Sequence, residues 1–109
     1  MWTVGALLTD TYFNLFDMTT FNDIESTSCG RRRQLFPNGW GVSVIPEYQS
    51  DDLYEVAVMR HDNGRHAQLT VESGLFGPNE QVSRRHTVDQ VDRIIQQIET
   101  LPDRNTAPN

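Results

Sequence analysis

The sequence predicts an α+β protein: a four-stranded antiparallel meander with a C-terminal amphipathic helix packed on one face and a short N-terminal helix or extension. Alternating apolar residues, separated by turn signals, recur between residues 31 and 73, and an apolar repeat with a helical period follows at residues 88–101. A chain of 109 residues has room for one hydrophobic core. We therefore expect one domain at residues 31–101, a partly helical extension at residues 1–30 and a flexible tail at residues 102–109.

The N-terminal extension is rich in aromatic residues and contains no basic residue. Its stretch TTFNDIEST is expected to form a short helix capped by Thr19 or Thr20. The apolar run from Val4 to Leu8 is short, follows no basic residue and ends close to Asp10. These features predict neither a signal peptide nor a membrane span.

The first hairpin is expected in the stretch RRRQLFPNGWGVSVIP, whose first six residues are a short strand candidate. Pro37 presets φ at the second position of a turn, and Asn38-Gly39 tolerates positive φ after it. This predicts a loop of about three to five residues with a bulge at Gly39. In the returning strand alternate residues share a face: Trp40, Val42 and Val44 on one, and Gly41, Ser43 and Ile45 on the other.

The second hairpin is expected from LYEVAVMR, HDNGRH and AQLTVES. Asn63-Gly64 is the strongest signal in the chain for a two-residue type I′ turn. Such a turn places Asp62 opposite Arg65, and His61 opposite His66. The flanking strands then expose two faces, with Tyr54, Val56, Val58, Ala67, Leu69 and Val71 on the inner one and Leu53, Glu55, Ala57 and Met59 on the outer one.

The C-terminal helix is the clearest element of the sequence. Residues 74–86 are expected to form a loop, after which Thr87 and Gln90 make a capping box. Pro102 ends the helix. One face carries an apolar stripe of Val88, Val91, Ile94, Ile95, Ile98 and Leu101.

An amphipathic helix needs an apolar surface, so we expect it to cover the inner face of the meander. The outer face, with Ile45, Leu53, Ala57 and Met59, is also apolar in part. Such a face is not expected to stay bare. We expect it to be covered by residues 1–28 or by a partner.

The charge and cysteine content restrict the classes of function. The formal net charge of −6 argues against a general polyanion binder, which draws on a surplus of Lys and Arg. All basic residues are arginine, a side chain that pairs bidentately with carboxylates and phosphates. Cys29 is the sole cysteine, so no internal disulfide can form, and a reducing compartment is expected.

No catalytic or cofactor motif is found: the sequence lacks a phosphate-binding loop, a nucleophile elbow and a zincin motif. His61 and His66 flank one turn, but a metal site needs a third ligand that the spacing does not supply. Cys29 beside Arg31 and His86 after two arginines are read as ordinary surface residues. We therefore expect no catalytic residues, no metal, no cofactor and no enzymatic activity.

The hairpin and strand motifs resemble those of small bacteriophage and prophage accessory proteins. The resemblance is carried by Phe36, Asn38-Gly39-Trp40-Gly41, VSVI and LYEVAV, followed by a terminal helix, and covers residues 31–101. Trp40 stands where Tyr is usual, and the long N-terminal segment is a further departure. The motifs specify turns and core strands. The resemblance thus implies a phage accessory protein in the host cytoplasm, and it implies no reaction.

We expect the protein to bind a host or phage protein, as a modulator of the host-takeover or anti-defence type. A homo-oligomer is the alternative partner, and neither nucleic acid nor a membrane is expected. The expected contact residues are Arg31, Arg32, Arg33, Trp40, Ile45, Leu53 and Met59.

The arginine triplet has three interpretations. Alternation points Arg31 and Arg33 one way and Arg32 the other, and charges of this kind protect the edge of a sheet from pairing with another sheet. A protein contact is the second interpretation. A nucleic-acid-binding module with an arginine patch is the third and is disfavoured by the net charge. A minor virion or assembly component is a further alternative for the whole protein.

Overall fold

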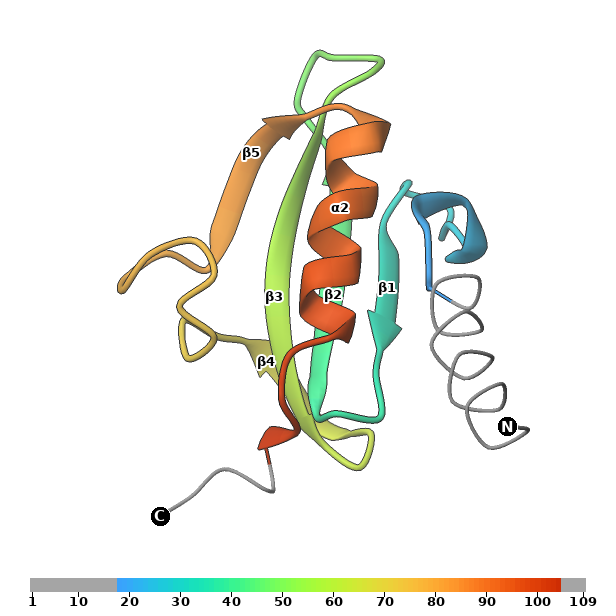
Figure 1. Cartoon of the computed structure of the whole chain (residues 1–109). Helices are drawn as coiled ribbons and strands as arrows, with labels where there is room; N and C mark the ends of the chain where they lie inside the picture. The colour runs from blue at the N-terminus through green and yellow to red at the C-terminus, as the bar shows by residue number, and fades with distance from the viewer. Residues whose placement is uncertain (1–17, 105–109) are drawn as a thin grey trace, which may run out of the picture.

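The computed structural model describes residues 18–104, which form one α+β unit (Figure 1). The helix α2 (Val88–Glu99) and the short 3-10 helix η1 (Phe21–Asp23) flank a single antiparallel sheet within these residues. The sheet contains β1 (Arg32–Leu35), β2 (Trp40–Pro46), β3 (Tyr54–Asp62), β4 (Arg65–Leu69) and β5 (Val82–His86). The predicted fold class is confirmed.

The sheet contains the predicted meander and one strand more. Strands β1 to β4 are neighbours in chain order, whereas β5 returns to pair with β3. The prediction of a loop over residues 74–86 is wrong in its last part, because Val82–His86 form this fifth strand. Two adjacent arginines hide its alternation, and a β-bulge with φ of 63° at Arg85 adds a residue to it. Both β4 and β5 lie on the same edge of β3, at its two halves.

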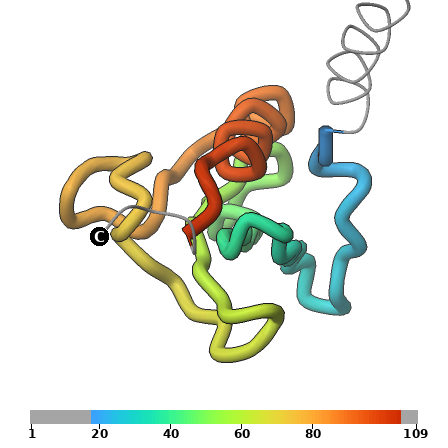
Figure 2. The backbone as a smooth tube through the Cα atoms, turned by 60° about the horizontal axis from the view of Figure 1, so that its bottom comes forward, coloured from blue at the N-terminus to red at the C-terminus, as the bar shows by residue number. Residues whose placement is uncertain are grey.

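The hydrophobic core lies between α2 and one face of the sheet (Figures 1 and 2). The helix begins with the predicted capping box, in which Thr87 N donates to Gln90 Oε1 at 2.9 Å and Gln90 N donates to Thr87 Oγ1 at 3.3 Å. The predicted stripe is buried at Val91, Ile94, Ile95 and Ile98. It packs on the inner-face residues Val42, Val44, Val56 and Val58.

The turn between β3 and β4 forms as predicted. Asn63 and Gly64 take φ angles of 52° and 87°, and Asp62 pairs with Arg65. The ladder then shifts, because β4 contains a β-bulge at His66, whose φ is 56°.

This bulge overturns two predictions about β4. His66 lies in the bulge and does not pair with His61. One added residue moves every later side chain to the opposite face of the sheet. Leu69 therefore pairs with Met59 and is 41% exposed rather than packed under the helix, and Val71 is 36% exposed.

The segment that precedes β1 contributes two side chains to the same core as the sheet. Thr20 caps η1, the short helix predicted here. Phe21 and Ile24 are 5% and 1% exposed within the core, and Phe21 N donates to Asp92 Oδ1 of α2 at 2.7 Å. This part of the predicted extension is thus integral to the domain, while residues 1–17 lie outside the described residues.

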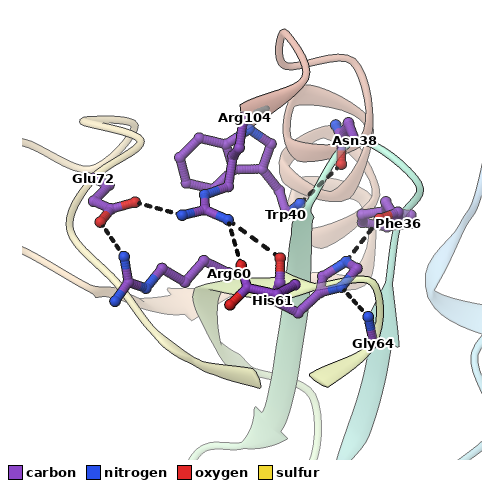
Figure 3. Close-up of polar contacts among 9 residues, drawn as sticks. Phe36, Asn38, Trp40, Arg60, His61, Gly64, Glu72 and Arg104 are labelled. Atoms are coloured by element: carbon purple, nitrogen blue, oxygen red, sulfur yellow. Dashed lines mark hydrogen bonds and ion pairs between the residues drawn. The ribbon is translucent and has the colours of Figure 1, made fainter. Parts of the chain in front are cut away.

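The Pro-Asn-Gly turn between β1 and β2 caps the C-terminal end of α2. Asn38 Nδ2 donates to the backbone oxygens of Ile98, Glu99 and Leu101 at 3.0, 3.1 and 3.1 Å. Its Oδ1 accepts from Trp40 N at 3.0 Å (Figure 3). The last carbonyls of a helix have no hydrogen-bond donor within the helix, so the Asn38 side chain of this turn donates to them.

The two glycines around Trp40 are required by space and backbone angle. Gly39 has a φ of 88°, as the predicted bulge position demands. A Cβ on Gly41 would meet Leu35 Cδ2 at 2.7 Å and Gln34 O at 2.8 Å. The N-G-W-G motif is therefore explained by packing between β1, β2 and α2.

The first residues of the predicted tail are held against this turn. Trp40 Nε1 donates to Pro102 O, and Arg104 N donates to Asn38 O, at 3.0 and 2.9 Å. The Arg104 guanidinium lies 5.5 Å from the Trp40 ring centroid and also contacts Glu72 (Figure 3). Residues 102–104 of the predicted tail thus pack against the domain, and residues 105–109 lie outside the described residues.

We predict that Asn38→Ala lowers the free energy of unfolding by about 1–2 kcal/mol, because it leaves helix carbonyls without a donor. Urea unfolding followed by circular dichroism measures this change. Asn38→Asp is the isosteric comparison and should cost at least as much, since it puts a carboxylate at the negative end of the helix dipole. Wild-type stability in Asn38→Asp would contradict the capping role.

Candidate binding groove on the outer face of the sheet

The arginine triplet is divided between the two faces of the sheet. Arg32 faces the core side: its Nη1 donates to Ile24 O at 2.6 Å and to Phe21 O at 3.3 Å, and its guanidinium lies 4.0 Å from the Phe21 ring centroid. Arg32 thereby ties the N-terminal segment to β1. Arg31 and Arg33 are exposed and line a groove on the other face.

The groove lies on the sheet face opposite α2 and has a volume of about 320 Å³. Its floor is recessed, since Ala57 and Met59 are only 7% and 6% exposed, whereas Leu69 on its wall is 41% exposed. All five strands or their flanks contribute to its lining, which consists of Arg31, Arg33, Ser43, Ile45, Glu55, Ala57, Met59, Ala67, Gln68, Leu69 and Val82. The groove is thus a mainly apolar hollow with cationic side chains at its β1 side.

The charged residues of the groove lining differ in whether they form ion pairs. Glu55 forms an ion pair with Arg84. Among residues 18–104, neither Arg31 nor Arg33 forms an ion pair with a carboxylate. The groove therefore presents two cations that lack a carboxylate partner in the described part of the chain, although the net charge of the chain is −6.

The structure brings four of the predicted contact residues together and separates three. Arg31, Arg33, Ile45 and Met59 line the groove. Arg32 and Trp40 lie on the core side, where Trp40 is 8% exposed, so neither belongs to the groove surface. The half-buried Leu53 is not part of the lining.

Sequence reasoning missed the lining from β4 and β5. Leu69 was expected on the inner face, because nothing in AQLTVES marks the bulge at His66. Val82 lies on the strand that was expected to be a loop. The positive φ positions at His66 and Arg85 carry no glycine, so neither bulge has its usual sequence signal.

His61 is a structural residue. It is 6% exposed, its Nδ1 accepts from Gly64 N at 2.7 Å, and its Nε2 donates to Phe36 O at 2.8 Å (Figure 3). Both ring nitrogens are occupied, so neither is free to ligate a metal. Within residues 18–104, no three His, Cys, Asp or Glu side chains are grouped closely enough to hold a metal ion.

A serine and a histidine meet on β5, an arrangement that sequence reasoning did not anticipate. Ser83 Oγ and His86 Nε2 are 2.6 Å apart across the β-bulge of this strand. Nucleophilic catalysis by such a pair requires a third group that orients the imidazole. No carboxylate hydrogen-bonds this ring within residues 18–104, and we interpret the contact as support for the bulge.

Cys29 is exposed and lies in the turn that precedes the triplet. Its Sγ is 3.3 Å from Thr27 Oγ1. The Thr27 hydroxyl and then the backbone N–H of Arg31 lower the pKa of the Cys29 thiol, because both stabilise the thiolate. The lowered pKa favours the thiolate form of Cys29, which is the form that reacts with electrophiles.

Comparison with known proteins gives no relative: no family model, no curated protein and no solved structure matches the chain. Within the described part of the chain, no helix has the length and apolar character needed to cross a bilayer.

The divided triplet predicts unequal effects of three alanine substitutions. Arg32→Ala should lower the free energy of unfolding by about 2 kcal/mol, because it removes charged hydrogen bonds to two backbone oxygens. Arg31→Ala and Arg33→Ala should change it by no more than about 0.5 kcal/mol. Urea unfolding of the three variants tests this, and equal effects at all three positions would refute the division.

For Cys29, we predict that iodoacetamide modifies the thiol with a midpoint at lower pH than it does a free cysteine, in line with the lowered pKa. Thr27→Val removes the hydroxyl that contributes most to the lowered pKa of Cys29, so the alkylation midpoint of this variant should move to higher pH. Rates measured across a pH series give both midpoints. An unchanged profile in Thr27→Val would exclude the hydroxyl as the cause.

Proposed function

We propose that the protein is a non-catalytic binding protein that engages another protein through the groove on the outer face of its sheet. The observation that carries this proposal is the combination of an apolar hollow and two arginines that no carboxylate of residues 18–104 pairs with. Arg and Met are enriched in protein interfaces, and recessed apolar pockets are where partner side chains anchor most strongly.

The setting proposed for this binding is a phage accessory protein acting on a host or phage protein in the bacterial cytoplasm. The resemblance of the hairpin and strand motifs in residues 31–101 to those of such proteins supports it. A role without catalysis accords with the use of His61 and Arg32 as structural residues.

A nucleic-acid-binding function is favoured by one observation: Arg31 and Arg33 form no ion pair with a carboxylate among the described residues. Binding of this kind would weaken steeply as salt increases. Among residues 18–104, no aromatic residue lines the groove, so this part of the chain offers bases no stacking surface there. The apolar floor is better suited to a protein partner.

Affinity capture tests the proposal, with tagged protein and lysate from a bacterial host with and without phage infection. Leu69→Glu places a charge on the groove wall, whereas Tyr48→Glu places the same charge on an 87% exposed residue outside the lining. A stoichiometric protein should be retained by the wild type and by Tyr48→Glu. Its recovery should fall at least about tenfold with Leu69→Glu.

Two results would contradict this proposal. Retention of the same protein by Leu69→Glu, with a wild-type circular dichroism spectrum, would place the contact elsewhere. Recovery of nucleic acid alone, released by salt, would favour the alternative function.

A further inference from the structure

The groove has the length of a short helix. Three lining residues of β3, Glu55, Ala57 and Met59, span about 13 Å along the strand at about 3.3 Å per residue. An α-helix rises about 1.5 Å per residue, so about nine residues cover this distance. The inner face of the same sheet is already covered by a helix of 12 residues, α2.

A strand is a less suitable occupant beside the arginines. The open side of β1 is bridged by Ser26, which pairs with Arg32, and Thr27 N donates to Arg31 O at 2.8 Å. Addition of a partner strand at this edge would have to displace those contacts. A partner lying on the face of the sheet, as helices do, displaces nothing.

The position of the two arginines indicates the charge of this helix. Arg31 and Arg33 are two residues apart along one side of the groove, about 6.6 Å in extended chain. Side chains at i and i+4 on one face of a helix are about 5–6 Å apart, so two carboxylates spaced in this way match them. Since Glu55 is neutralised by Arg84, no lining carboxylate opposes an acidic ligand.

We propose that the groove binds an acidic amphipathic helix of the partner protein, with its apolar stripe over Met59, Ala57 and Leu69 and two carboxylates one turn apart beside Arg31 and Arg33. This inference rests on the proposed function and adds the chemistry of the partner segment. Arg31 and Arg33 line the groove, and neither is paired with a carboxylate of residues 18–104, so they would orient such a helix by its acidic side.

Two synthetic peptides of about 14 residues test the inference. They share one leucine stripe and differ only at two flanking positions, i and i+4, which are Glu in one peptide and Lys in the other. Each is titrated into the full-length ¹⁵N-labelled protein and followed by amide chemical shifts. The Glu peptide should shift the amides of Arg33, Ile45, Met59 and Leu69 saturably and bind at least about tenfold more tightly than the Lys peptide.

A charge exchange supplies the decisive control. The double variant Arg31→Glu with Arg33→Glu should reverse the preference, losing the Glu peptide and gaining the Lys peptide. The matched variant, Arg65→Glu with Arg93→Glu, changes the net charge equally at exposed positions outside the groove and should keep the wild-type preference. Gain of binding by the exchanged pair cannot result from unfolding.

The inference is overturned if the wild type binds both peptides equally, if neither peptide shifts the groove amides, or if the matched variant behaves like the exchanged one. Groove shifts that depend on protein concentration without peptide would identify a second copy as the occupant and also overturn it. Failure of these titrations, with the captured protein still lost in Leu69→Glu, would leave the binding function standing and exclude only the acidic helix.

Discussion

The junction between the first hairpin and the end of α2 organises the whole domain. The last carbonyls of a helix need partners, and Asn38 supplies them from the sheet while Thr100 Oγ1 donates to Gln96 O and Gln97 O. This junction sets the position of α2 over the valines of β2 and β3. Because Trp40 and Arg104 pack at the same place, the end of the helix, the turn and the start of the tail depend on one another.

Local sequence patterns were sufficient to predict the elements that are determined by residues close together in the chain. The Asn63-Gly64 turn, the Thr87–Gln90 capping box and the stripe of α2 each depend on residues within a few positions, and all three formed as predicted. The strand β5 was missed because it pairs with β3, a strand far from it in the sequence. The face of Leu69 was missed because a bulge without glycine reverses the alternation that the prediction relied on.

The difference between local patterns and long-range contacts also explains how much of the candidate site could be predicted from the sequence. Alternation alone separated Arg31 and Arg33 from Arg32, and it placed Ile45 and Met59 on one face. It could not show that Arg32 is occupied by two backbone oxygens of the N-terminal segment, nor that Trp40 is buried beside Pro102. Those contacts join residues far apart in the chain, and only the packed structure brings them together.

The two bulged strands that share one edge of β3 have a consequence for the protein in a crowded cell. A long, straight outer strand would offer unpaired backbone groups to other chains and invite aggregation. Here that edge is split into β4 and β5, which have five residues each, and each is interrupted by a bulge. At the opposite edge of the sheet, Ser26 pairs with Arg32 of β1 and Thr27 N donates to Arg31 O. The sheet therefore has an accessible apolar outer face, while its edges offer little unpaired backbone to other chains.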